Sequence, residues 1–218
     1  MCCFSLFHKT LKALFLASVV LSVKAEAHPV SFTGAKGIMG FHSPIISHNQ
    51  LNYSFRHWFA LGVHYVKRPS LDQRDGVFVT ANFLLKRWNG AGSQANLYTN
   101  LGLGQGRLSD ESQPSAFGLV QFDIENRGYY FLAKHLRIQT EDRVDLDQSV
   151  VRLGIAPYVV DYEGLHSWLI LETQNLKFND GESILDMTPF LRVFYKNLLF
   201  EIGQSFDGVT KFNYIAHF

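Results

Sequence analysis

The chain ends in Lys211-Phe212-Asn213-Tyr214-Ile215-Ala216-His217-Phe218, a stretch with a two-residue period. Apolar side chains occupy every second position: Phe212, Tyr214, Ala216 and Phe218. Successive side chains of a β-strand point to opposite faces, so this spacing puts all four on one face of an extended backbone. The segment therefore predicts a strand with one apolar face.

The same alternation recurs through most of the chain. The clearest runs lie at 51–56, 59–66, 77–86, 96–104, 118–124, 129–139, 151–159, 167–174, 185–193 and 198–205. Turn residues separate them, for example Asn179-Asp180-Gly181 and Asp207-Gly208. With one further strand within 30–42, the pattern predicts an all-β chain of about twelve strands, with ten to fourteen possible. Proline cannot donate to a strand ladder, so Pro157 and Pro189 each predict a bulge or local break.

The first 27 residues have the pattern of a secretory signal peptide. Lys9 and Lys12 precede the apolar run 13–23, and Ala25-Glu26-Ala27 is a cleavage site of the A-x-A type. We therefore expect 1–27 to be removed and 28–218 to form a single domain. Both cysteines fall within the removed segment, so the mature chain is expected to contain no disulfide.

An export signal combined with a C-terminal aromatic strand resembles the bacterial outer-membrane β-barrel proteins. The resemblance implies a single antiparallel up-and-down transmembrane barrel in the cell outer membrane. It also implies contact with outer-membrane lipids and recognition by the barrel-assembly machinery through Phe212, Tyr214 and Phe218. The closing strand departs from the fuller family pattern, because Gly208 lies too far upstream and Ala216 stands where a bulkier residue is usual. No subfamily is indicated.

An even strand number places both termini on the periplasmic side of such a barrel. The polar loops near 43–49, 68–76, 108–115, 140–147, 178–183 and 206–208 would then be extracellular. Aromatic residues are 14% of the chain and charged residues 18%, a balance that suits lipid-facing strands with aromatic girdles. We expect the girdles to be formed by Trp58, Tyr65, Trp88, Tyr129, Tyr130, Tyr158, Trp168, Tyr195 and Phe218.

A soluble periplasmic β-sandwich or lipid carrier would also alternate, with its apolar strand faces turned inward. The polar faces here are rich in Gly, Asn, Ser and Tyr and poor in Lys and Glu, which favours the membrane barrel. The net charge is +1 with acids and bases interspersed, so no nucleic-acid partner is expected.

Charged residues of both signs are expected to point into the barrel from four consecutive C-terminal strands. They are Arg152, Glu172, Asp186, Arg192 and Glu201. Two interpretations follow: a polar pore lining that selects small solutes by charge, or an interior salt-bridge network that fills a narrow barrel. The sequence therefore predicts a narrow channel or a passive structural barrel.

No enzymatic function and no cofactor are predicted. On a strand, a histidine and a serine share a face when they are two positions apart, whereas His42-Ser43 and His166-Ser167 are adjacent. The alternative to a channel is a barrel that binds a metal or a partner. His28 at the expected mature N-terminus, and His42 and His48 beside the first outer loop, are the candidate metal ligands.

Overall fold

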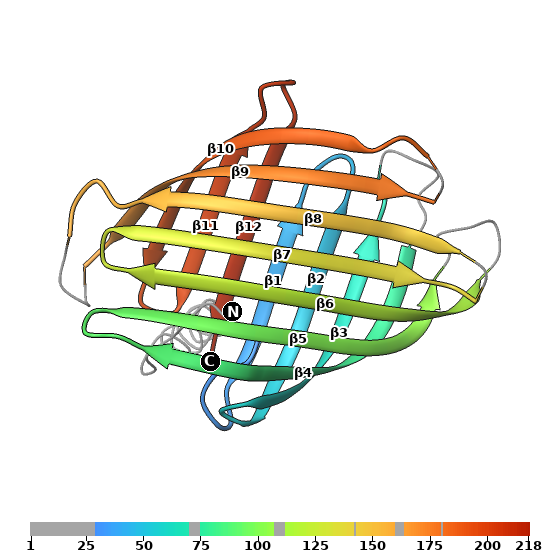
Figure 1. Ribbon diagram of the computed structural model, residues 1–218, viewed down its shortest axis with the longest axis horizontal. Helices are drawn as coiled ribbons and strands as arrows, with labels where there is room; N and C mark the ends of the chain where they lie inside the picture. Colours follow the sequence, from blue (N-terminus) through green and yellow to red (C-terminus); the bar gives the residue numbers. More distant parts are fainter. Residues whose placement is uncertain (1–28, 70–74, 107–111, 142, 160–163, 180) are drawn as a thin grey trace, which may run out of the picture.

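The computed structural model describes residues 29–69, 75–106, 112–141, 143–159, 164–179 and 181–218. Twelve antiparallel strands form one closed barrel (Figure 1). They are β1 (Lys36–His42), β2 (Ser47–Arg56), β3 (Phe59–Lys67), β4 (Asp75–Asn89), β5 (Ser93–Gly106), β6 (Gln113–Asn126), β7 (Tyr129–Gln139), β8 (Val144–Ile155), β9 (His166–Phe178), β10 (Ile184–Tyr195), β11 (Leu198–Gln204) and β12 (Thr210–His217).

Each strand pairs with its neighbours in sequence, and β12 returns to pair with β1, where Tyr214 lies opposite Gly40. The predicted all-β, up-and-down barrel of about twelve strands is confirmed. The predicted signal peptide 1–27 and His28 lie outside the described residues. Within the described ranges, no helix is long and apolar enough to cross a membrane.

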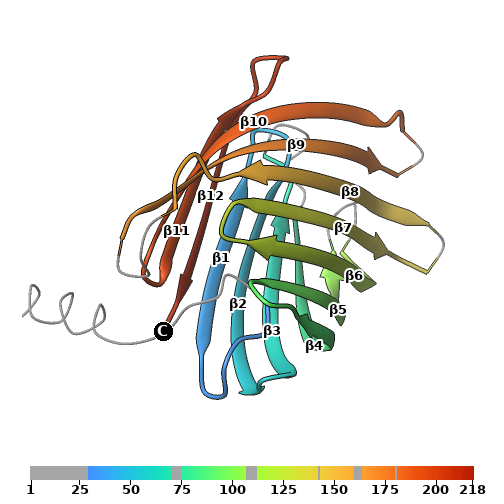
Figure 2. The same cartoon turned by 60° about the vertical axis from the view of Figure 1, so that its left-hand side comes forward.

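The barrel is flattened rather than round. In Figure 1, β4 to β9 cross the front, and β11, β12 and β1 to β3 pass behind them at a steep angle. Figure 2 shows the same wall curling continuously from β9 through β12 to β1. Flattening brings the two inner faces close together, so inward side chains from opposite walls can pack against one another.

The alternation along each strand separates an outer from an inner face. On β4, Phe78, Thr80 and Asn82 point inward and are buried. Val77 and Val79, which alternate with these residues, are 49% and 62% exposed on the outside. The same arrangement puts exposed aliphatic and aromatic side chains on the outside of every strand: examples are Ile38, Leu51, Leu61, Leu85, Leu101, Val120, Tyr129, Leu153, Leu169, Leu191, Ile202 and Phe212.

The interior is layered along the barrel. The end carrying the loops after β1, β3, β5, β7 and β9 holds an apolar cluster: Ile46, Val66, Phe78, Phe117, Leu119, Leu136, Ile138, Leu146, Leu176 and Phe178. The end carrying the chain termini holds two smaller apolar clusters, one around Tyr98 and one around Tyr130 and Phe190. Charged and polar side chains fill the space between these layers.

The prolines differ from the prediction. β8 ends at Ile155, so Pro157 lies beyond the strand. Pro189 pairs with Leu171 in an unshifted β9–β10 ladder, so it forms no bulge there. The Pro189 carbonyl oxygen lies close to Gly203 on β11. The β10–β11 ladder ends at Phe190, one residue after Pro189. The backbone N–H that proline lacks is therefore not needed for pairing with β11. The register shifts between Ser54 and Arg56, Leu84 and Lys86, and Ile138 and Gln139.

Candidate functional site in the barrel interior

All five predicted charged residues point into the barrel, and none is more than 8% exposed. They come from β8, β9, β10 and β11, as the sequence predicted: Arg152, Glu172, Asp186, Arg192 and Glu201. Strand register sets the main pairs, because Arg152 lies directly opposite Glu172 and Arg192 directly opposite Glu201. Opposite charges in facing positions are close enough to bond across a sheet.

Glu201 is the centre of the network. Arg192 Nε donates to Glu201 Oε1 at 2.6 Å, and Arg152 Nη1 donates to Oε2 at 3.0 Å. Asn213 Nδ2 from β12 donates to Oε2 at 2.7 Å. One carboxylate therefore links three strands besides its own, and its charge is balanced by two guanidinium groups.

A second branch passes through Lys211 of β12. Arg152 Nε donates to Glu172 Oε2 at 2.7 Å, and Lys211 Nζ donates to Glu172 Oε1 at 2.9 Å. Lys211 Nζ also lies 2.5 Å from Asp186 Oδ2, which accepts a hydrogen bond from Thr188 as well. The network thus ties β8, β9, β10, β11 and β12 into one connected set.

Lys211 and Asn213 were not among the predicted interior residues. The sequence pattern that indicates their inward direction is in the closing strand, where they alternate with the outward Phe212 and Tyr214. The same inward series continues to His217, which is buried at the terminus end of the barrel. Applying the two-residue period to the polar side of β12 would have found them.

The space left inside the charged layer is small. One cavity has a volume of about 80 Å³ and is lined by Gln50, Asp123, Lys134, Arg152, Arg192 and Glu201, among others. A second of about 40 Å³ is lined by His48, Lys134, Gln148, Glu172 and Lys211, among others. Cavities of this size accommodate a few water molecules. The apolar cluster then covers the charged layer on the loop side.

Lys134 borders both cavities. Its ammonium nitrogen lies 4.9 Å from the centre of the Phe41 ring, a cation–π arrangement. Arg192 lies over Tyr130 in the same way at 4.4 Å. Lys134 and Arg152 line both cavities, so a solute inside either one would lie beside positive charge.

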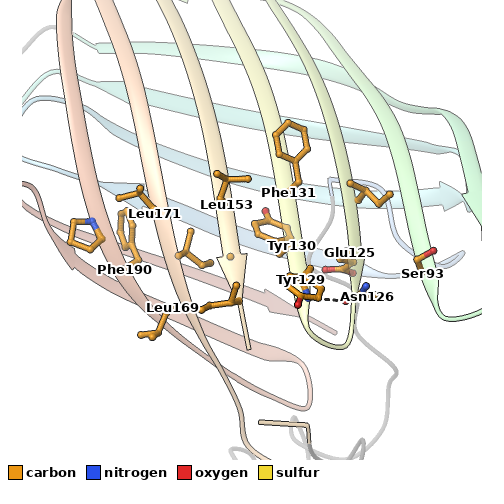
Figure 3. A pocket seen from close by; sticks show the side chains of 15 residues that line it. Ser93, Glu125, Asn126, Tyr129, Tyr130, Phe131, Leu153, Leu169, Leu171 and Phe190 are labelled. Atoms are coloured by element: carbon orange, nitrogen blue, oxygen red, sulfur yellow. Dashed lines mark hydrogen bonds between the residues drawn. The ribbon is translucent and has the colours of Figure 1, made fainter. Parts of the chain in front are cut away.

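A larger hollow of about 790 Å³ is almost entirely apolar (Figure 3). Outward residues such as Phe131, Leu153 and Leu171 line it together with the inward Tyr130 and Phe190. Polar atoms occur at its edge, where Asn126 accepts hydrogen bonds from the backbone of Gly128 and Tyr129. The surface is suited to hydrocarbon and offers no set of convergent polar groups.

The predicted metal ligands do not converge. His42 points outward and bonds through Nδ1 to Ser47 Oγ at 2.7 Å, whereas His48 points inward and lies 3.1 Å from Nδ1 of His64. Neighbouring register positions on β1 and β2 hold them on opposite faces of the wall. Among the described residues, no group of three or more His, Cys, Asp or Glu side chains could hold a metal ion.

Most of the predicted girdle residues lie near strand ends, with Trp58, Trp88, Tyr129 and Tyr195 exposed at the terminus end. Tyr130 and Trp168 are corrections, because both point inward and pack in the apolar cluster at that end. In the C-terminal strand, Phe212 and Tyr214 face outward, and their ring centroids lie 6.1 Å apart. Phe218 N donates to Lys36 O, which joins the two ends of the barrel wall.

The chain is similar to a solved structure described as KdgM porin. The two chains are 11% identical with a TM-score of 0.44, and the aligned part covers 84% of this chain and 98% of that chain. No protein-family model and no curated protein sequence matches.

Proposed function

We propose that this protein is an outer-membrane β-barrel with a side-chain-filled interior, acting as a structural barrel in which any solute path is narrow and charge-lined. The observation that supports this proposal is the buried network centred on Glu201, which occupies the middle of the barrel interior. The apolar cluster that includes Phe78, Phe117 and Phe178 also fills the loop end of the interior.

The outer surface supports the location. Exposed apolar side chains surround a closed antiparallel wall, and Trp58, Trp88, Tyr129 and Tyr195 stand near one rim. A closed barrel satisfies its backbone hydrogen bonds internally, which the hydrocarbon of a bilayer demands. A soluble sandwich would place these apolar faces inside, so the outward arrangement favours a lipid-facing wall.

Two partners follow from this proposal. The apolar exterior would contact outer-membrane lipids along all twelve strands. The barrel-assembly machinery would recognise β12, where Phe212 and Tyr214 are presented on the outside next to the closing seam with β1.

The interior distinguishes a closed barrel from an open channel. Paired carboxylates and guanidinium groups in a dehydrated space satisfy one another, and opening a path would separate them. The geometry therefore favours a closed resting state over a permanently open pore. A narrow channel remains the second candidate, supported by the polar cavities beside Lys134.

Cell fractionation followed by electrophoresis with and without boiling tests the location. A band in the outer-membrane fraction that shifts on heating is the expected result, whereas a freely released periplasmic band would refute the proposal. Single-protein conductance in planar bilayers tests the interior. We expect no steady wide-pore conductance from the folded protein, and a steady large current would show that the barrel is open.

A further inference from the structure

A polar patch lies on the outer wall near the loop ends of β7 and β8, and the exposed Lys177 of β9, directly opposite Asp147, extends it. Four of its residues are called the wall patch below: His135 and Arg137 of β7, and Asp147 and Ser149 of β8. Strand register places His135 directly opposite Ser149 and Arg137 directly opposite Asp147. All four point outward, away from the charged interior.

The wall patch has apolar neighbours in its own cross-strand row. The row through His135 and Ser149 reaches Val120 on one side, which is 50% exposed. On the other side it passes Asn175 and reaches Leu185, which is 65% exposed. Charged and ionisable side chains are costly on a lipid-facing surface, and where they occur they commonly mark a function.

The side chains in the wall patch bond to one another in an ordered way. His135 Nδ1 lies 3.0 Å from Ser149 Oγ. The other ring nitrogen, Nε2, lies 3.7 Å from Asp147 Oδ2. Arg137 holds the same Asp147 oxygen through Nε at 3.0 Å and Nη2 at 2.9 Å. A serine, an imidazole and a fixed carboxylate thus stand in sequence along the outer wall.

We propose that Ser149, His135 and Asp147 form a hydrolytic Ser–His–Asp site on the outer wall of the barrel that cleaves carboxylic esters of membrane lipids. The order of the three groups is that of an activated serine nucleophile, its base and the carboxylate that orients the base. The site lies outside the barrel, so it does not depend on whether the interior conducts.

In the proposed site Nδ1 of His135 is the base, because it is the ring nitrogen next to the Ser149 hydroxyl. To act so, Nδ1 must accept from that hydroxyl, and the ring proton must then be on Nε2, on the side of Asp147. The Asp147 carboxylate favours this tautomer and stabilises the imidazolium that forms during reaction. Arg137 fixes the carboxylate, and the 3.7 Å separation is the loose spacing common in sites without substrate.

In the reaction, Ser149 Oγ bonds to the ester carbonyl carbon while its proton passes to His135 Nδ1. The carbon–oxygen bond to the alcohol breaks, and His135 returns the proton to the leaving alkoxide oxygen. Water then attacks the acyl group on Ser149, giving its proton to His135. That proton returns to Ser149 Oγ as a carboxylic acid leaves. Asp147 and Arg137 act as positioning residues.

The position of the wall patch points to a lipid ester. One row further toward the termini the outer wall becomes apolar again, with Ala133 opposite Val151 and then Phe131 opposite Leu153. Gly118, the cross-strand neighbour of Arg137, has open space where a side chain would project. An acyl chain lying along the apolar wall would bring its ester to the polar row, and Gly118 leaves room for it.

The outer wall also supplies a control. His42 Nδ1 and Ser47 Oγ form a second outward His–Ser pair at 2.7 Å, on β1 and β2. The side-chain Nδ2 of Asn49 donates to the Ser47 hydroxyl at 3.4 Å, and the side-chain Oδ1 of Asn49 accepts from the Tyr214 hydroxyl. Among the salt bridges of the described residues, none joins His42 to a carboxylate, so this pair lacks the third group of the site.

The test uses the full chain folded in detergent micelles, with folding checked by the heat shift on gels. A fluorophosphonate probe, p-nitrophenyl butyrate and phosphatidylethanolamine vesicles are the reagents. We expect the probe to modify Ser149 and the protein to hydrolyse esters. Ser149→Ala and His135→Gln should each lower the rate at least 100-fold, in line with the contribution of general-base catalysis. Ser47→Ala should leave the rate unchanged.

A positioning role for Asp147 has its own readout. Asp147→Asn should lower kcat with little change in KM, and Asp147→Glu should restore part of kcat. If the folded protein neither takes the probe nor hydrolyses either ester above the Ser149→Ala variant, the wall patch is structural and the proposal is wrong. Loss of activity with Ser47→Ala but not with Ser149→Ala would overturn it equally. Activity on p-nitrophenyl butyrate alone would support the hydrolytic site and reject lipid as its substrate.

Discussion

Arg152 and Glu172 face each other across β8 and β9, and Arg152 Nε donates to Glu172 Oε2 at 2.7 Å. The same guanidinium group reaches Glu201 on β11 from its Nη1 atom at 3.0 Å. β11 is separated from β8 by β9 and β10, so this contact spans the interior instead of following the wall. It shows that ionic contacts inside the barrel join strands that are not neighbours in the wall.

Removing the central carboxylate should destabilise the barrel strongly. Glu201→Gln leaves Arg152 and Arg192 buried with one fewer acid, and breaking a buried ion pair in this way costs about 3–5 kcal/mol. We expect a lower urea midpoint for loss of the heat-resistant form. Glu182→Gln, at an exposed position before β10, is the matched control. Equal midpoints for the two variants would contradict a role for the network in stability.

Lys211 and Asp186 should show strong coupling. Lys211→Met leaves the Asp186 carboxylate buried without its counterion, Asp186→Leu leaves Lys211 paired with Glu172 alone, and the double variant removes both charges. The double variant should therefore lose less stability than the sum of the single variants, by about 0.5–3 kcal/mol. Equilibrium unfolding in urea measures this difference. Simple additivity would show that the 2.5 Å contact contributes no pair energy.

Close approach between β4 and β5 should make Gly104 intolerant of any side chain. A Cβ atom there would lie 1.9 Å from the Val77 carbonyl oxygen, and a backbone atom cannot move away easily. Gly104→Ala should destabilise by about 1–3 kcal/mol through overpacking. Gly118→Ala is the control, because nothing lies within 4 Å of the place its methyl group would occupy. The temperature at which half of the protein loses its heat-resistant gel mobility is measured for both variants. Equal temperatures would contradict the expected clash at Gly104.

The apolar cluster should act as the barrier to conduction. Phe78→Ala with Phe117→Ala removes two packed rings, 5.5 Å apart, from the loop end of the interior. We expect measurable ion current in planar bilayers where the unaltered protein gives none. Adding Arg192→Gln should then shift selectivity toward cations, since one lining positive charge is lost. Unchanged selectivity in the opened barrel would exclude Arg192 from the lining.

Metal binding should not depend on His42 and His48 acting together. Because they occupy opposite faces of the wall, His42→Ala with His48→Ala should leave the affinity of the full chain for Cu²⁺ or Zn²⁺ unchanged. Isothermal titration calorimetry measures this affinity. A large loss of affinity in the double variant, with each single variant near normal, would mean that the two rings share a metal.

The sequence alone determined the strand alternation, the all-β class and the inward direction of Arg152, Glu172, Asp186, Arg192 and Glu201. These follow from the two-residue period of a strand, which is a local property of the backbone. Turn residues such as Asn179 and Gly208, both at positive φ, also fixed where hairpins reverse. The strand number followed because every alternating run became one strand.

Only the tertiary structure decided which side chains meet. Barrel closure brought Lys211 and Asn213 of β12 to acids on β9, β10 and β11, and flattening brought Arg152 to Glu201 across the interior. Cross-strand register likewise joined His135 to Ser149 and Asp147, which a search for His and Ser on a single strand could not find. The period of a strand gives the face of each residue, but partners depend on register and closure, which are set by the whole sheet.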